Sequence, residues 1–206
     1  MIRLKNLRNT DEIMDKFYDY CGSVGPTKCA LNLGKSSASD IRASVETLIS
    51  ELKEDPIAVP RSLTRGPEII TYSDVMQMIR YSLYKPLKLF PEVADLLSDL
   101  VYRDGTKFAD FKQKGHEPSC PLRECTEKMK PCHPDNMETS AGILCSDGTD
   151  ISNTTKEQFK EISAILYGES KWLGEVWATI LMPCVHWKGK AKWRITGGKS
   201  LACEDS

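Results

Sequence analysis

The chain has 206 residues, with 28 Lys and Arg against 29 Asp and Glu, which gives a formal net charge of -1. This charge balance argues against a nucleic-acid binder, for which a basic excess is typical. The 40% hydrophobic and 28% charged residues are typical of a folded globular protein long enough to bury its own core. No apolar run reaches the roughly 18 residues of a membrane span, and the charged first residues do not resemble a secretory signal. We therefore expect neither a nucleic-acid nor a membrane partner.

The first clear helical pattern follows Thr10, where Ile13, Phe17 and Tyr20 lie on one stripe. A second helix is predicted after Ser37 and Asp40, which match an N-terminal capping pattern. Its apolar residues recur at helical spacing and are Ile41, Val45, Leu48, Ile49 and Leu52. The prolines at positions 56 and 60 then end this helix and open an extended linker.

Further helices are expected in the next third of the chain. Residues 69–71 fit a short extended piece, and Ser73 is predicted to cap a helix with Val75, Ile79 and Leu83 turned inward. Pro91 is placed in the first turn of the following helix. The Asp-Gly pair at 104–105 should stop that helix, and a short helix is expected from Thr106 to Lys114.

The helical pattern is lost between Gly115 and Thr139, a stretch interrupted by prolines. Thr155 and Gln158 then form a capping box, followed by a stripe over residues 159–166 and a Trp-rich helix over residues 171–182. We see no βαβ alternation, so the predicted class is mainly α with at most short strands. The expected segments are a first helical part at 1–114, a Cys/Pro-rich insertion at 115–139, a turn with Trp-rich helices at 140–196, and a frayed tail at 197–206.

Eight cysteines are scattered along the chain. An even number at such spacings favours disulfides formed in an oxidising compartment. Asn153-Thr154-Thr155 is an N-glycosylation sequon and points to the same compartment. A secretory-pathway protein is therefore expected, and since the sequence has no leader, its true beginning is expected to be missing.

Motifs for catalysis are absent from the sequence. It holds no G-x-S-x-G, the pentad that places the nucleophile of an α/β-hydrolase on a sharp turn, and no P-loop, dinucleotide-binding or H-E-x-x-H motif. Ser170 has glycine on one side only, and Ser146 lacks the leading glycine. His186 follows Cys184 too closely in the chain for the two side chains to form a nucleophile–base pair. We therefore assign no catalytic residue and no cofactor.

The best metal candidate is the cluster in the insertion, which comprises His116, Cys120, Cys125, Cys132 and His133. Zinc sites of this kind usually contain a C-x₂₋₄-C knuckle, and the spacings here have no C-x-x-C. We therefore prefer a disulfide within a surface insertion and assign no metal ligand, and one cysteine would then remain for Cys203 or stay free. Residues 147–150 begin like a calcium loop but lack the glutamate at its end, so they are interpreted as a turn.

Four local patterns, taken together and in this order, resemble one family. They are Cys21-x-x-x-Gly25-Pro26-x-x-Cys29-Ala30, YSDVMQMIRYSLYKPLKLFPEVADLL at 72–97, AGILCSDG at 141–148, and Trp177-Ala178 followed by Cys184-x-x-Trp187 and AKWR, which ends at Arg194. The order is similar to that in the secreted tripeptidyl-aminopeptidase-like (TAP-like) α/β-hydrolases, especially their fungal members. The resemblance covers about residues 11–196, and the cysteine-rich stretch after Lys112 diverges from it.

The resemblance implies a helical lid, inserted between two strands of a serine-hydrolase core. It implies that the nucleophile lies before Met1 and the acid and histidine after Arg194, so no triad residue falls in this chain. The parent enzyme would be secreted and would hydrolyse short peptides or esters, while this chain supplies substrate access and specificity and is inactive alone. The resemblance further implies the disulfides Cys21–Cys29 and Cys145–Cys184.

Two other functions are left open by the sequence. A non-catalytic helical interaction module would use an exposed apolar lid face, and such a face favours self-association. A zinc-stabilised module would be built on the cluster between Cys120 and His133.

Overall fold

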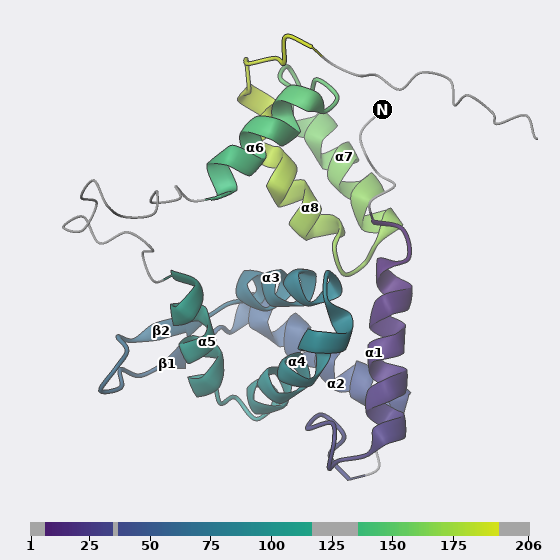
Figure 1. Ribbon diagram of the computed structural model, residues 1–206, viewed down its shortest axis with the longest axis vertical. Coiled ribbons are helices and arrows are strands. Elements are labelled where there is room, and N and C mark those ends of the chain that lie inside the picture. Colours follow the sequence, from purple (N-terminus) through teal and green to yellow (C-terminus); the bar gives the residue numbers. More distant parts are fainter. Residues whose placement is uncertain (1–6, 35–36, 117–135, 194–206) are drawn as a thin grey trace, which may run out of the picture.

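The computed structural model describes residues 7–34, 37–116 and 136–193, and the side chains of residues 115, 116 and 136–138 fall outside that description. Within these ranges eight α-helices and one two-stranded sheet are present, so the predicted mainly α class with short strands is confirmed (Figure 1). The elements are α1 (Thr10–Val24), α2 (Ala38–Glu54), β1 (Ile57–Val59), β2 (Glu68–Ile70), α3 (Tyr72–Leu83), α4 (Pro86–Val101), α5 (Thr106–His116), α6 (Asn136–Asp147), α7 (Lys156–Glu169), α8 (Gly174–Leu181) and the 3₁₀ helix η2 (Met182–His186).

Helix α2 forms as its sequence predicts. The Ser37 Oγ accepts a hydrogen bond from the Asp40 N–H at 3.2 Å, and the Asp40 carboxylate accepts one from the Ser37 N–H at 3.0 Å. The hydrogen bonds from Ser37 also lower the pKa of Asp40 below its ordinary value. The residues of the predicted stripe that are buried are Ile41, Val45, Leu48 and Leu52. The capping box at Thr155 and Gln158 is confirmed in the same way at the start of α7.

Helix α3 begins earlier than predicted. Its N-cap is Thr71, not Ser73, because Thr71 and Asp74 form a reciprocal capping box: the Thr71 N–H donates to the Asp74 carboxylate at 2.8 Å. The extended piece predicted at 69–71 is present as β2, one residue earlier, and it pairs with β1, which lies in the expected linker. Strands β1 and β2 are antiparallel, with Ile57 opposite Ile70 and Val59 opposite Glu68.

Helix α4 also begins one turn or more before the predicted start. Pro86 occupies the first turn, where a missing N–H costs nothing, and Pro91 lies inside the helix. An interior proline removes the hydrogen bond to the carbonyl four residues earlier, here that of Leu87. The Leu87 side chain is 92% exposed, and Pro91 is exposed as well, so water reaches this part of the helix.

The C-terminal helices differ most from the prediction. The segment from residue 140, expected to open with a turn, begins instead within α6, whose consecutive Ile143, Leu144 and Cys145 give no helical stripe. The turn predicted at 147–150 follows directly, since residues 148–150 belong to no helix. The predicted helix over 171–182 starts only at Gly174, because residues 170–173 connect α7 to α8, and it continues as η2 through Pro183.

The described helices pack around two separate apolar cores. The larger core lies among α1–α5 and the hairpin, which we call the N-terminal unit (residues 10–116), and it also receives Trp172 and Val176. The smaller core lies among α6, α7, α8 and η2, which we call the C-terminal unit (residues 136–187), and it includes Leu7. Figure 1 shows the C-terminal unit above the N-terminal unit, with α1 rising along one side toward α7.

Tyr18 is a buried polar group in the larger core. Its side chain is 1% exposed, its hydroxyl has no hydrogen-bond partner among the described residues, and the Arg42 guanidinium lies 5.1 Å from its ring centroid. Burial raises the pKa of the phenol well above its ordinary value. The folded protein therefore holds the phenol proton more tightly than the unfolded chain. The stability that this proton linkage contributes is complete below the unfolded pKa near 10 and is lost as the pH rises beyond it, so the free energy of unfolding falls there.

Replacing Tyr18 with Phe is expected to raise the free energy of unfolding at neutral pH by about 1 kcal/mol, because the unsatisfied hydroxyl is removed. The variant should also lose less stability between pH 10 and 12 in urea unfolding. Tyr20→Phe is the matched control, since the Tyr20 side chain is 57% exposed and its replacement should change neither quantity. A less stable Tyr18→Phe protein would show that the hydroxyl has a stabilising partner.

Candidate functional site

Ser170, one of the two serines considered from the sequence, connects α1 to the segment between α7 and α8 through hydrogen bonds. It is 1% exposed, and its Oγ donates to Asp11 Oδ1 at 2.6 Å while accepting from the Leu173 N–H at 2.9 Å. The second carboxylate oxygen of Asp11 accepts the Lys171 N–H at 2.9 Å. Asp11 therefore ties the start of α1 to the connection between α7 and α8. A buried hydroxyl that donates to a carboxylate, with no histidine among the described residues beside it, is not an activated nucleophile.

The other candidates from the sequence are also not brought together for catalysis. The Ser146 Oγ accepts a hydrogen bond from the Trp187 indole N–H at 3.1 Å. His186 is exposed on η2 and lines none of the hollows described below. The structure thus gives each of these residues a structural or surface position.

Four of the expected site residues form disulfides. Cys21 pairs with Cys29 across the end of α1, and Cys145 of α6 pairs with Cys184 of η2. The first closes a loop with a sequence separation of 8 and the second one of 39. These are the two pairs that the family resemblance implied.

The candidate zinc cluster cannot be placed. Cys120, Cys125, Cys132 and His133 lie outside the described residues, as does Cys203, and the side chain of His116 is not described either. Across residues 7–34, 37–116 and 136–193, no group of three or more His, Cys, Asp or Glu side chains is arranged to hold a metal ion.

A hollow lined by both aromatic and charged side chains lies where the two units meet. This junction hollow, of about 250 Å³, is bordered by α2 and α3 on one side and by Tyr167, Lys171 and Trp172 on the other. Its walls combine aromatic rings with charged groups. The full set of lining residues is Glu46, Ile49, Ser50, Lys53, Tyr72, Met76, Tyr167, Lys171 and Trp172.

The charges of the junction hollow are paired across the two units. The Lys171 Nζ lies 2.7 Å from Glu46 Oε1, and the Lys53 Nζ lies 3.9 Å from Glu175 Oε1 and 4.6 Å from the Tyr72 ring centroid. The Tyr72 hydroxyl also donates to Glu175. Burial, and then this hydrogen bond, raise the pKa of Tyr72 above its ordinary value. These groups suit the binding of a polar ligand against aromatic walls, and they include no nucleophile with a neighbouring base.

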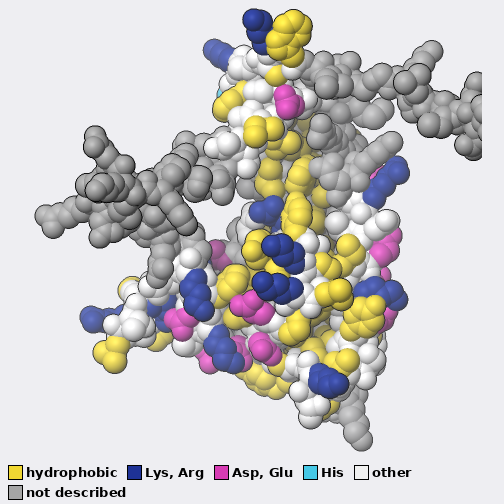
Figure 2. Space-filling model, viewed as in Figure 1, with side chains coloured by type: hydrophobic (Ala, Val, Ile, Leu, Met, Phe, Trp, Pro, Cys, Tyr) yellow, Lys and Arg dark blue, Asp and Glu magenta, His cyan; other side chains and the backbone are white. Residues whose placement is uncertain are grey.

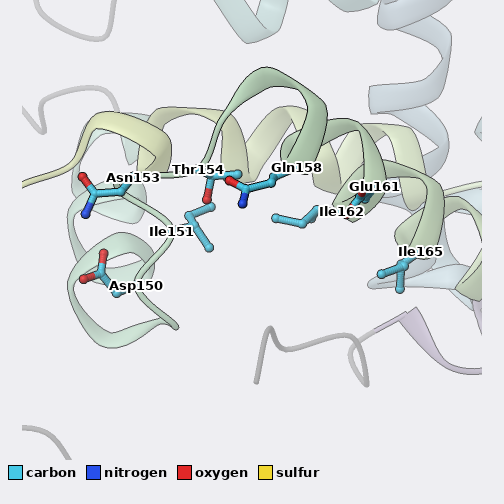
Figure 3. Close-up of a pocket in the computed structure, with 8 residues that line it drawn as sticks. All are labelled: Asp150, Ile151, Asn153, Thr154, Gln158, Glu161, Ile162 and Ile165. Carbon is cyan, nitrogen blue, oxygen red and sulfur yellow. The ribbon is translucent and has the colours of Figure 1, made fainter.

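Two further hollows have different linings. Figure 3 shows one of about 420 Å³ between the turn at 150–154 and α7, where Asp150 is already engaged by Lys190 and Ser152. The other, of about 210 Å³, is an apolar groove between the end of α1 and the start of α4. It is lined by Phe17, Tyr20, Cys21, Val24, Lys28, Cys29, Pro86, Leu87, Phe90, Pro91 and Ala94.

Apolar side chains form a column on the surface around α8 (Figure 2). Figure 2 shows a column of hydrophobic side chains there that continues toward the junction with the N-terminal unit, where Lys and Arg side chains gather beside Asp and Glu. Helix α8 reads GEVWATIL, and although Val176 and Ala178 are buried, Trp177 and Ile180 are only partly so. The exposed side chains of α8 are Glu175 and Thr179, and Glu175 is engaged by Tyr72 and Lys53 at the junction.

None of the described helices is long and apolar enough to cross a membrane. Sequence reasoning did not identify the junction hollow, because its charged residues come from α2 and from the connection between α7 and α8, and no local spacing connects them. No family model, curated protein or solved structure matches the chain.

Proposed function

We propose that this chain forms the helical lid of a secreted serine hydrolase of the TAP-like type. In this role it controls access and specificity for a short peptide or ester substrate. The Ser-His-Asp triad would belong to an α/β core outside these 206 residues. The four local patterns named above suggest the family, and the mainly helical architecture with two disulfides is consistent with a lid from a secreted enzyme.

The apolar column over α8 is the observation that carries this proposal. It lies on the C-terminal unit, and the same unit holds both ends of the described helical body: Leu7 is buried in its core, and residues 187–193 follow η2. An inserted lid leaves and rejoins its host at one end and packs an apolar face on that host. The apolar column would therefore be the face that meets the core.

The junction hollow would supply the specificity of the lid. Its rings and paired charges come from both units, so a shift of one unit against the other would change its shape. Lids act in this way when they close over a substrate and exclude water from the reaction. The chemical step itself would be acyl transfer to water by the triad of the core.

A fluorophosphonate, which reacts with activated serines, tests the claim that this chain carries no nucleophile. The folded 206-residue chain should remain unlabelled under conditions in which a reference serine hydrolase is labelled completely. Ser170 should not react because its hydroxyl is buried and donates to Asp11. Labelling of any serine of the folded chain that disappears after heat denaturation would contradict the proposal.

A non-catalytic interaction module is the second candidate, and the apolar groove favours it. Leu87 on the rim of this groove is 92% exposed, and a second copy of the chain could cover it. In this case the protein should self-associate in sedimentation velocity, and Leu87→Asp should keep it monomeric. Leu63→Asp is the control, since Leu63 is fully exposed in the hairpin loop. A wild-type chain that stays monomeric at all concentrations would exclude this candidate.

A further inference from the structure

The turn between α6 and α7 contains Asn153, the asparagine of the N-glycosylation sequon. Asn153 begins Asn153-Thr154-Thr155, the one Asn-x-Ser/Thr sequence in the chain. The side chain of Asn153 is exposed, and its carboxamide has no hydrogen bond to any described residue. The turn itself is held by the backbone, since the Thr154 N–H donates to the Ile151 carbonyl at 3.1 Å. A group attached to Asn153 would therefore break no contact of the fold.

Space for such a group is available around the turn. Figure 3 shows Asn153 at one end of the 420 Å³ hollow, with its carboxamide directed away from α7. The hollow is open to solvent, and its wall continues along α7 through Gln158, Ile162 and Ile165. The Ile165 side chain is 51% exposed. A saccharide on Asn153 could extend into solvent or along this wall without displacing a side chain of the core.

The order of residues along the chain also favours modification. Disulfides form in the compartment in which asparagines are glycosylated, and the structure holds two of them. Glycosylation requires an accessible segment, and Asn153 precedes Cys184 in the chain. During synthesis the sequon is therefore exposed before Cys145 can pair with Cys184 and fix the C-terminal unit.

We propose that Asn153 carries an N-linked glycan. The donor is a lipid-linked oligosaccharide diphosphate. The Asn153 amide nitrogen forms a bond to the anomeric carbon of the first sugar, and the bond from that carbon to the diphosphate oxygen breaks. The lipid diphosphate leaves with the electron pair, and the amide nitrogen gives up one proton to the base of the transferase. This proposal does not depend on the hydrolase assignment.

The test uses the full chain expressed behind a secretory leader in a eukaryotic host, with protein from cells and medium combined. Peptide N-glycosidase should reduce its mass by one core glycan and leave aspartate at position 153 in peptide mapping. Asn153→Gln should remove the glycan, and Thr154→Ala, which keeps the sequon, should retain it. Recovery of disulfide-bonded wild-type protein without any glycan would overturn the proposal.

The hydroxyl residue of the sequon provides a second comparison, because Thr155 also caps α7. Thr155→Ser keeps both the cap and the sequon, and it should be glycosylated and folded. Thr155→Ala should lose both the glycan and part of the stability of α7, whereas Asn153→Gln should lose the glycan alone. A glycan that persists in Asn153→Gln would place the modification elsewhere and contradict the assignment.

Discussion

Replacing Cys145 and Cys184 together with Ala is expected to lower the free energy of unfolding of the C-terminal unit by about 4 kcal/mol. The loop that this disulfide closes has a sequence separation of 39, and the loop-entropy estimate gives that value. Few other buried residues stabilise this unit, because its core is small and Cys184 itself belongs to it. Urea unfolding followed by tryptophan fluorescence measures it, since Trp177 packs against this core, while Trp172 reports on the larger core.

The Cys21–Cys29 pair provides the comparison for this experiment. Its loop has a sequence separation of 8, so the double replacement with Ala should cost about 2.5 kcal/mol by the same estimate. It lies in the N-terminal unit and should have less effect on the tryptophan signal. Equal losses in the two double variants, or no loss in the Cys145/Cys184 variant, would contradict the importance of loop length here.

Gly174→Ala is expected to destabilise the protein by about 3 kcal/mol, the upper part of the range for overpacking. Gly174 begins α8 at its closest approach to α7. An added Cβ would lie 2.5 Å from the Leu166 carbonyl oxygen and 2.5 Å from the Tyr167 Cα. Both neighbours are backbone atoms, so the two helices would have to separate. Thermal and urea unfolding should show the loss, with the greatest effect on tryptophan fluorescence.

Gly168→Ala is the matched control for this variant. Gly168 lies in the same pair of helices, near the end of α7, but a Cβ there would meet nothing within 4 Å. Because alanine favours a helix over glycine by about 1 kcal/mol, this variant should be slightly more stable than the wild type. Opposite signs for the two variants would confirm close backbone packing, whereas a neutral Gly174→Ala would contradict it.

The parts of the fold that follow from local patterns could be predicted from the sequence. Helix α2 is the clearest case, since the Ser37 capping box and the stripe from Ile41 to Leu52 act within one element. The hairpin was not predicted as a pair, because its strands have three residues each and no alternation that is long enough to detect. Helix α6 was missed for a similar reason: its apolar residues do not follow the helical period, and Ile143 is 62% exposed.

Long-range polar contacts could not be predicted from the sequence. Asp11 and Ser170 are separated by 159 residues, yet the hydrogen bond between them helps to join the two units. The Tyr72–Glu175 contact spans 103 residues and holds Tyr72, which lines the junction hollow, against α8. Neither pair belongs to a motif, because its spacing depends on how the helices pack. The candidate site therefore became visible only when the two units were placed together.

The measurement that tests the proposed lid most directly is fluorophosphonate labelling of the natural polypeptide that contains this sequence. The polypeptide would be captured with antibodies against the 206-residue chain, labelled and mapped by mass spectrometry. We predict one labelled serine within a G-x-S-x-G sequence that lies outside these 206 residues but in the same polypeptide. A natural polypeptide that contains no reactive serine, or whose labelled serine lies within this chain, would contradict the proposal.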